Sequence, residues 1–218
     1  MRTHENPRCQ GCHKNPKICL CGRIPPRPLA HRLIVYQHPV EIWRASNTAM
    51  LITGLYPSAQ IVIRGEPQGE AYLDRLLAEP DCRPFVLFPE PGAREAGEIA
   101  AAGFPEGIRP LWILIDGSWR QARRMRRRLI RERAIPAVRL DPARESNYRV
   151  RRQRRAGNLA TAEAAALLIG RLNGEASPDA ALQDVFDEWI EEILVMRGLL
   201  PIAQKAPARV LLPLQPPA

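Results

Sequence analysis

Short apolar runs recur between residues 33 and 140, and they predict the strands of a sheet. The runs cover residues 33–36, 61–63, 85–88, 111–115 and 137–140, each about as long as a buried strand. Helical patterns lie between and after them, at 43–55, 70–77, 93–102, 118–133, 162–172 and 185–199. Strands that alternate with helices in this way indicate an α/β domain with a parallel sheet covered on both faces.

The chain has 218 residues, which suits one α/β domain of ordinary size. Three prolines, Pro25, Pro26 and Pro28, predict a stiff linker. We therefore expect an N-terminal segment, residues 1–28, followed by a main domain at residues 29–218. The tail from residue 207 onward is rich in proline and is expected to be irregular, with Val210, Leu211 and Leu212 packed on the domain.

The strand at 111–115 runs directly into a turn and a helix. Asp116 and Gly117 form the turn, Ser118 opens the helix, and Gln121 three residues later completes a capping box. Ligands in open α/β sheets bind outside the carboxyl ends of the strands, so Asp116 is a candidate site residue. The alternatives are that Asp116 caps the helix and that Trp119 belongs to the core.

Two other strand ends carry candidate residues. His38 follows the first strand, where it could contact a ligand or a phosphate, or could cap the next helix. The loop at residues 87–89 contains a proline and could hold an adenine ring against Phe88. Further along, Thr161 is the expected N-cap of a helix with Glu163 in its first turn, and such a helix end suits a carboxylate ligand.

The positive charge is concentrated in one segment. The chain has a net charge of +9, but residues 120–155 contain 15 arginines and 3 acidic residues, which leaves the rest of the chain at −3. This asymmetry indicates a polyanionic partner such as nucleic acid. One face of the expected helix is basic and is formed by Arg120, Arg123, Arg124, Arg127, Arg128 and Arg131. The alternative is that this face is an ordinary solvated surface.

The opposite face of that helix is apolar, with Trp119, Ala122, Met125, Leu129 and Ile130. Arg126 and Arg133 point toward this side, and no partner for them is evident in the sequence. A second basic stretch, residues 146–155, combines Tyr148 with arginines. Phosphate contacts supply affinity for RNA, and a ring can stack on an unpaired base, although a solvated loop is the alternative.

Four of the five cysteines lie near the N-terminus, at Cys9, Cys12, Cys19 and Cys21. Four thiolates at this spacing are typical of a structural zinc site, and a segment with so few apolar residues needs a metal to fold. His13 is an alternative fourth ligand. An empty vestigial site or a redox-active pair of cysteines are the other interpretations. Cys82 is expected to be an ordinary thiol.

Several function classes are disfavoured because their motifs are missing. The sequence contains no glycine-rich dinucleotide fingerprint, no phosphate-binding P-loop and no nucleophile elbow, which argues against dehydrogenases, P-loop NTPases and α/β-hydrolases. The sequence shows no signal peptide and no apolar run long enough to span a membrane, so we expect a cytoplasmic protein.

In combination, the motifs resemble the DTW-domain family of tRNA-uridine aminocarboxypropyltransferases. The resemblance runs from Cys9 to about residue 200. It rests on the cysteine quartet and on His38-Pro39, Leu87-Phe88-Pro89, Asp116-Gly117-Ser118-Trp119, Tyr148-Arg149-Val150-Arg151 and Leu159-Ala160-Thr161-Ala162-Glu163-Ala164, in that order. Ser118 replaces the usual threonine but keeps the hydroxyl, whereas Ala160 replaces a serine found in many members.

The resemblance implies a SPOUT-like, trefoil-knotted fold and S-adenosylmethionine as the donor of a 3-amino-3-carboxypropyl group. The acceptor would be N3 of a uridine in tRNA, and 5′-methylthioadenosine would be released. Asp116 would act as the base for N3 or anchor the ammonium group of the donor, and the expected catalytic residues are Asp116, Ser118 and Trp119. The expected donor site consists of Leu87, Phe88, Pro89, Ile115, Asp116, Gly117, Leu140, Thr161 and Glu163. The expected RNA contacts are His38, Arg120, Arg123, Arg124, Arg127, Tyr148, Arg149, Arg151 and Arg152.

Three other functions remain open at this stage. The chain could be a SPOUT-type RNA methyltransferase that uses the same donor, or could transfer the aminocarboxypropyl group to ribosomal RNA. It could also be a non-catalytic, zinc-containing RNA-binding module. The sequence leaves the oligomeric state open, because many SPOUT-like enzymes dimerise whereas members of this kind can act as monomers.

Overall fold

A single parallel sheet forms the centre of the molecule. The computed structural model describes residues 8–141, 146–148, 159–205, 207 and 210–212. Within them six parallel strands are arranged in the order β2-β1-β5-β3-β6-β4. They are β1 (Arg32–Gln37), β2 (Gln60–Ile63), β3 (Cys82–Leu87), β4 (Arg94–Glu95), β5 (Arg109–Asp116) and β6 (Ala137–Arg139). The predicted α/β class with a parallel sheet is confirmed.

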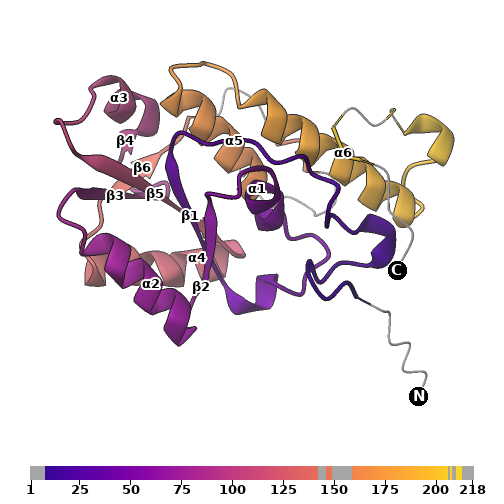
Figure 1. Cartoon of the computed structure of the whole chain (residues 1–218), viewed down its shortest axis with the longest axis horizontal. Coiled ribbons are helices and arrows are strands. Elements are labelled where there is room, and N and C mark those ends of the chain that lie inside the picture. The colour runs from indigo at the N-terminus through magenta and orange to yellow at the C-terminus, as the bar shows by residue number, and fades with distance from the viewer. Residues whose placement is uncertain (1–7, 142–145, 149–158, 206, 208–209, 213–218) are drawn as a thin grey trace.

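Helices cover both faces of this sheet (Figure 1). One face carries α1 (Ala49–Leu55), α3 (Ala96–Ala101), α5 (Thr161–Leu172) and α6 (Ala180–Met196). The other carries α2 (Pro67–Leu77) and α4 (Trp119–Arg126), which continues as the π-helical η3 (Arg127–Glu132). Successive strand residues point to opposite faces. Trp112 and Leu114 therefore join the core beneath α1, α5 and α6, whereas Ile113 packs with Met125 of α4.

The helices predicted at 70–77 and 185–199 begin earlier in the structure, at Pro67 and Ala180, and two other predicted helices begin later. Residues 93–102 contain the short strand β4 before α3, because Arg94 pairs with Val138 of β6 and the Glu95 side chain caps the helix. The helix expected at 43–55 begins only at Ala49. Before it lie the short 3-10 helix η2 (Pro39–Glu41) and a turn, and the amide of Ala49 donates to the Asn47 side chain at 2.8 Å.

The N-terminal segment packs on α6 and is part of the main core. It includes the short 3-10 helix η1 (Pro16–Ile18), and Ile18 and Leu20 are buried in the same cluster as α6. Arg23 donates two hydrogen bonds to Glu192 of α6, at 2.8 and 2.6 Å. The domain boundary at residue 28 stays a prediction.

The C-terminal part of the described chain also returns to the core. It contains η4 (Ile202–Gln204), and beyond it Leu211 is 4% exposed with its amide donating to Glu188. The expected packing of Leu211 is confirmed, whereas Leu212 is exposed. Among the described residues, no helix combines the length and apolar character that a membrane span requires.

Candidate functional site

A cavity of about 190 Å³ lies where the carboxyl ends of β3, β5 and β6 meet the first turns of α4 and α5. Eight predicted site residues line it: Leu87, Phe88, Pro89, Ile115, Gly117, Trp119, Leu140 and Thr161. Sequence reasoning missed Leu114, Ala122, Arg139, Leu159 and Ala164, which also line it. Most of the lining is apolar, as a pocket for an adenosine group requires.

Asp116 ends β5 at the margin of this cavity and is only 6% exposed. Its two carboxylate oxygens accept different hydrogen bonds, one from the Gln37 amide at 2.7 Å and one from the Thr161 hydroxyl at 2.5 Å. These bonds favour the ionised form of a carboxylate. Sequence reasoning missed Gln37, although a polar residue at the end of the apolar strand next to β5 was the signal that could have found it.

The helix after Asp116 is capped by other residues. The Ser118 hydroxyl accepts from the amide of Gln121 at 3.4 Å, and the Gln121 side chain accepts from the amide of Ser118 at 2.7 Å. The predicted capping box is therefore confirmed, and the alternative of a helix-capping Asp116 is wrong. A Cβ on Gly117 would lie 3.1 Å from the Cβ of Gln121, so the turn favours glycine.

Trp119 lies at the rim of the cavity and is 42% exposed, so the alternative that placed it in the core is wrong. The Trp119 and Phe88 rings meet edge to face, with centroids 6.0 Å apart. The guanidinium of Arg126 lies 5.3 Å from the centre of the Phe88 ring and forms an ion pair with Glu90. Aromatic and cationic contacts thus hold the Phe88 ring, and Glu90 is the partner of Arg126 that the sequence did not reveal.

The N-cap of α5 is Ala160, which corrects the prediction of Thr161. Thr161 is the first residue of the helix, and its hydroxyl donates to Asp116. No acceptor for the Thr161 or Glu163 amide is present in the part of the chain that the structure describes. These amides offer an anion-binding position at the helix end.

The Glu163 side chain holds the chain in place around the helix start. Its carboxylate accepts from the amides of Ala160 and Asn147, both at 2.8 Å, and from the Ser146 hydroxyl. Glu163 does not line the cavity. Its predicted contact with the donor stays a prediction, and the amide of Glu163 is better placed for it than the carboxylate.

His38 follows β1, and its side chain contacts the first turn of α4. Its Nδ1 accepts from the amide of Val40 at 3.3 Å and from the Gln121 side chain at 3.1 Å. The first contact caps η2, as one of the two sequence interpretations expected. Burial, together with the nearby charges of Arg64 and Arg44, lowers the pKa of His38 and favours the neutral ring at pH 7. A contact between His38 and RNA stays a prediction.

The basic face of α4 is exposed as expected, and Ala122, Met125 and Leu129 are buried on its other side. Four predicted RNA contacts form no ion pair with any described residue: Arg120, Arg123, Arg124 and Arg127. Arg128 instead lies 3.8 Å from Glu70. Acidic groups of the described chain therefore do not neutralise most of this face.

The other predicted RNA contacts are less accessible or lie outside the described residues. Tyr148 is 9% exposed, and its hydroxyl donates to the carbonyl of Ser46 at 2.5 Å. This placement does not support base stacking by Tyr148. Arg149, Arg151 and Arg152 lie outside the described residues.

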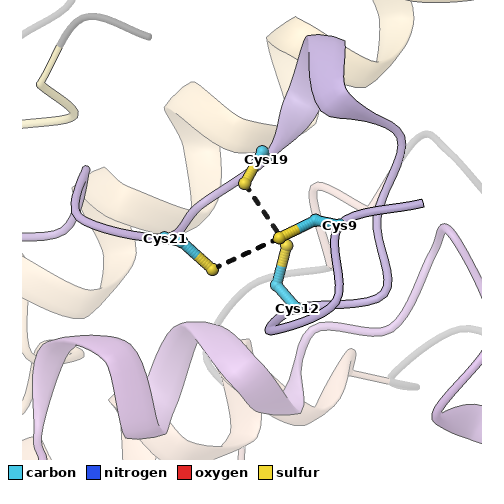
Figure 2. Close-up of side chains that lie close together, drawn as sticks. All are labelled: Cys9, Cys12, Cys19 and Cys21. Carbon is cyan, nitrogen blue, oxygen red and sulfur yellow. Dashed lines mark hydrogen bonds between the residues drawn. The ribbon is translucent and has the colours of Figure 1, made fainter. Parts of the chain in front are cut away.

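The four N-terminal cysteines converge on one point (Figure 2). Their sulfur atoms all lie within 4.8 Å of one another, with Cys9–Cys21 and Cys12–Cys19 at 3.6 Å. Four sulfurs bonded to a tetrahedral Zn²⁺ at ~2.3 Å lie about 3.8 Å apart, so this arrangement fits the ion. The backbone amide of Cys12 contributes most to lowering the pKa of Cys9 to about 6, which favours the thiolate.

The remaining candidates for this site lie elsewhere. The His13 ring packs against Trp43, with centroids 4.5 Å apart, and is not part of the metal-binding group. Cys82 belongs to β3, and burial raises the pKa of its thiol. The four cysteines are therefore a complete ligand set without His13.

Comparison with known proteins places the chain in a family. The chain is 27% identical to tRNA-uridine aminocarboxypropyltransferase 2 of Drosophila melanogaster over 172 residues, 76% of this chain and 66% of the relative. The protein of the same name from Mus musculus is 30% identical over 176 residues, 78% of this chain and 58% of the relative. Less than two thirds of each relative is thus covered. No solved structure matches the chain. The family model of the DTW domain matches residues 6–194, and the chain therefore belongs to the DTW-domain family.

Proposed function

We propose that this protein is a tRNA-uridine aminocarboxypropyltransferase that uses S-adenosylmethionine. The observation that carries the proposal is the junction after β5. One turn places Trp119 at an apolar cavity, with Asp116 between the lining residues Ile115 and Gly117. It also exposes Arg120, which forms no ion pair with a described residue. A small-molecule pocket and a basic surface thus begin at the same residues. The names of the related proteins support the same activity.

The cavity offers the groups that such a donor needs. Leu87, Phe88 and Leu140 form apolar walls for an adenosine. The amides of Thr161 and Glu163, which have no acceptor among the described residues, suit a carboxylate. When bound, S-adenosylmethionine supplies the 3-amino-3-carboxypropyl group for N3 of a uridine, and 5′-methylthioadenosine is released. The residues of the chain mainly position the two reactants, because the sulfonium already activates the donor.

Asp116 performs the decisive step in this proposal. At the end of β5, its carboxylate accepts hydrogen bonds from the Gln37 amide and the Thr161 hydroxyl. It either accepts the proton of uridine N3 or binds the ammonium group of the donor. Both roles require the negative charge that these hydrogen bonds stabilise.

The reaction is tested with purified protein, S-adenosylmethionine and tRNA that lacks the modification. We expect aminocarboxypropyl-uridine by nucleoside mass spectrometry and an equal amount of methylthioadenosine. Asp116→Asn should lose turnover by at least a hundredfold, since it keeps the shape but not the charge. Glu106→Gln, an exposed acid before the other end of β5, is the matched control. Release of S-adenosylhomocysteine would instead identify a methyltransferase. A protein that binds RNA but forms no product would be a binding module.

Calorimetry of donor binding distinguishes the two roles of Asp116. If the carboxylate anchors the ammonium group, Asp116→Asn binds S-adenosylmethionine at least tenfold more weakly. If the carboxylate is the base, donor affinity is preserved and only turnover falls. Wild-type turnover in the variant would exclude both roles.

We also propose that the cysteine cluster holds a structural zinc ion. All four positions are occupied by protein ligands, and Ile18 and Leu20 attach the segment to α6. Purified protein should contain one zinc per chain. Cys12→Ser should lose the zinc and lower the melting temperature, whereas Cys82→Ser should retain the metal. A metal-free wild-type protein with unchanged stability would refute this assignment.

The SPOUT-like trefoil knot belongs to the same proposal. Residues 142–145 and 149–158, between β6 and α5, lie outside the described chain. The parallel sheet and the cavity at its carboxyl edge are compatible with the fold that the family resemblance implies.

A further inference from the structure

A second cavity, of about 370 Å³, lies between the cysteine segment, α1 and the first two strands. His13 and Cys21 line it from the segment, Met50 and Thr53 from α1, and Gln37 from β1. The proposed reaction does not use this cavity. Its lining mixes amide, hydroxyl and apolar groups, as a site for a partly polar ring requires.

Trp43 lies beside this cavity and is 55% exposed, an unusual exposure for an indole. Its ring packs on His13, a residue of the cavity wall, at 4.5 Å and an interplanar angle of 52°. The Arg8 guanidinium donates to the carbonyls of both Trp43 and His13, at 2.6 and 3.2 Å. The His13 ring and the Arg8 contact to the backbone therefore hold Trp43 in place, while much of the indole faces solvent.

The second cavity is connected to the proposed reaction centre through Asp116. The side chain of Gln37 lines the second cavity, that of Thr161 lines the first, and both donate to the Asp116 carboxylate. The amide of His38 also donates to the carbonyl of Asp116 at 2.9 Å, and Trp43 follows His38 by five residues. Trp43 therefore lies in the segment that follows β1, and the end of β1 is hydrogen-bonded to Asp116.

Arg64 supplies a positive charge on the same side. It follows β2, and its amide donates to the carbonyl of Gln37 at 2.8 Å. The buried Nε of Arg64 has no hydrogen-bond partner, and its guanidinium forms no ion pair with any described residue. Gln37 directly precedes His38, so the backbone of Arg64 lies beside the end of β1. A phosphate is the natural partner of such a guanidinium.

We propose that Trp43, backed by His13, and Arg64 form a subsite for an unpaired nucleotide next to the target uridine. The base stacks on the exposed indole and its phosphate binds Arg64. Stacking on an aromatic ring tolerates any base, so this subsite recognises single-stranded RNA and not a particular sequence. The inference rests on the proposed function insofar as RNA is the acceptor. Together with the basic face of α4, the subsite gives RNA two contact regions near Asp116.

Affinity for tRNA, measured without S-adenosylmethionine, tests the subsite. Trp43→Ala should bind about 5- to 150-fold more weakly, and Trp43→Phe should keep most of the affinity because a ring remains. Leu199→Ala is the matched control, since Leu199 is 65% exposed and follows the end of α6. Arg64→Gln should reduce the slope of log affinity against log salt by about one. Wild-type affinity in Trp43→Ala, or an equal loss in the alanine and phenylalanine variants, would overturn the proposal.

Fluorescence gives a second measurement that does not depend on folding of the alanine variant. Trp112 and Trp189 are buried, so a short single-stranded RNA should quench the emission of Trp43 and of Trp119 alone. The quenching should be smaller in Trp43→Phe than in the wild type, and identical quenching in both would refute the stacking. Zinc content, measured in parallel, shows whether the cysteine segment is intact in each variant.

Failure of the subsite differs from failure of the proposed function. If the proposed function fails, the wild type binds tRNA but releases no methylthioadenosine, and the Trp43 variants still differ in affinity. If the subsite fails, the wild type carries out the transfer and Trp43→Ala binds and reacts as the wild type does.

Discussion

The arginines between residues 120 and 133 form two groups that differ in what they face. Arg126 pairs with Glu90, and Arg133 donates to Glu70 and Asp74 at 2.9 and 2.8 Å. The exposed group, Arg120, Arg123, Arg124 and Arg127, forms no ion pair with a described residue. Arginine is thus used in two ways in this one helical segment: two arginines pair with acidic residues of the fold, and four face solvent.

The comparison shows that the partner and not the residue type decides the role of each arginine. Glu70, the partner of Arg133, is 8% exposed and also accepts from the Tyr36 hydroxyl and the Gly65 amide, at 2.7 and 2.9 Å. Removing Arg133 would break a buried network. Like charges spaced along the outer face of α4 repel one another, and an external polyanion relieves that repulsion.

The largest difference between the two groups should appear in stability. Arg133→Gln removes the cation that pairs with Asp74 and the nearer of the two cations at Glu70, and we expect the free energy of unfolding to fall by about 2 kcal/mol. Urea denaturation measures the change. Arg131→Gln, which removes an exposed arginine two residues earlier, should change stability by less than about 0.5 kcal/mol. Equal losses in both variants would remove the distinction between the groups.

RNA binding should show the opposite pattern. Arg124→Gln removes one phosphate contact, so the slope of log affinity for tRNA against log salt should decrease by about one while stability stays unchanged. Arg83→Gln is the control, because Arg83 is exposed near the start of β3, at the opposite end of the sheet. A slope that is the same in the wild type and in Arg124→Gln would contradict a phosphate clamp on α4.

Much of the fold was predictable from the sequence because five of the strands contain a short apolar run. A strand that is buried on both faces appears in the sequence as a continuous apolar run, as the residues around Ile113 do. β4 was missed because Arg94 and Glu95 carry no apolar signal and their pairing with β6 depends on tertiary contacts. The late start of α1 was missed because the turn before Ala49 contains apolar residues such as Trp43, whose exposure the pattern does not reveal.

The two candidate sites differ in how far the sequence could predict them. The cysteine ligands lie within 13 residues, so their spacing in the sequence was enough to predict the metal site. The cavity combines loops from four parts of the chain, and only the family resemblance brought Phe88, Leu140 and Thr161 together before the structure did. Gln37 and Arg64 were missed because each is an ordinary polar residue at a strand end until its neighbours are known.

The smallest expected effect is a pH dependence of the stability that Glu70, the partner of Arg133, contributes. Burial alone would raise the pKa of Glu70, but the Gly65 amide, the Tyr36 hydroxyl and Arg133 together lower it below its ordinary value of 4.5. A carboxyl with a lowered pKa in the folded state stabilises the protein above its unfolded pKa, and this contribution disappears as the pH falls through the folded pKa. The stability difference between wild type and Glu70→Gln should therefore shrink as the pH falls below the ordinary value of 4.5. Urea denaturation of both proteins at a series of pH values measures the change. A Glu70→Gln difference that is constant with pH would mean that the network does not hold Glu70 in its charged form, and Arg133 would then contribute by packing alone.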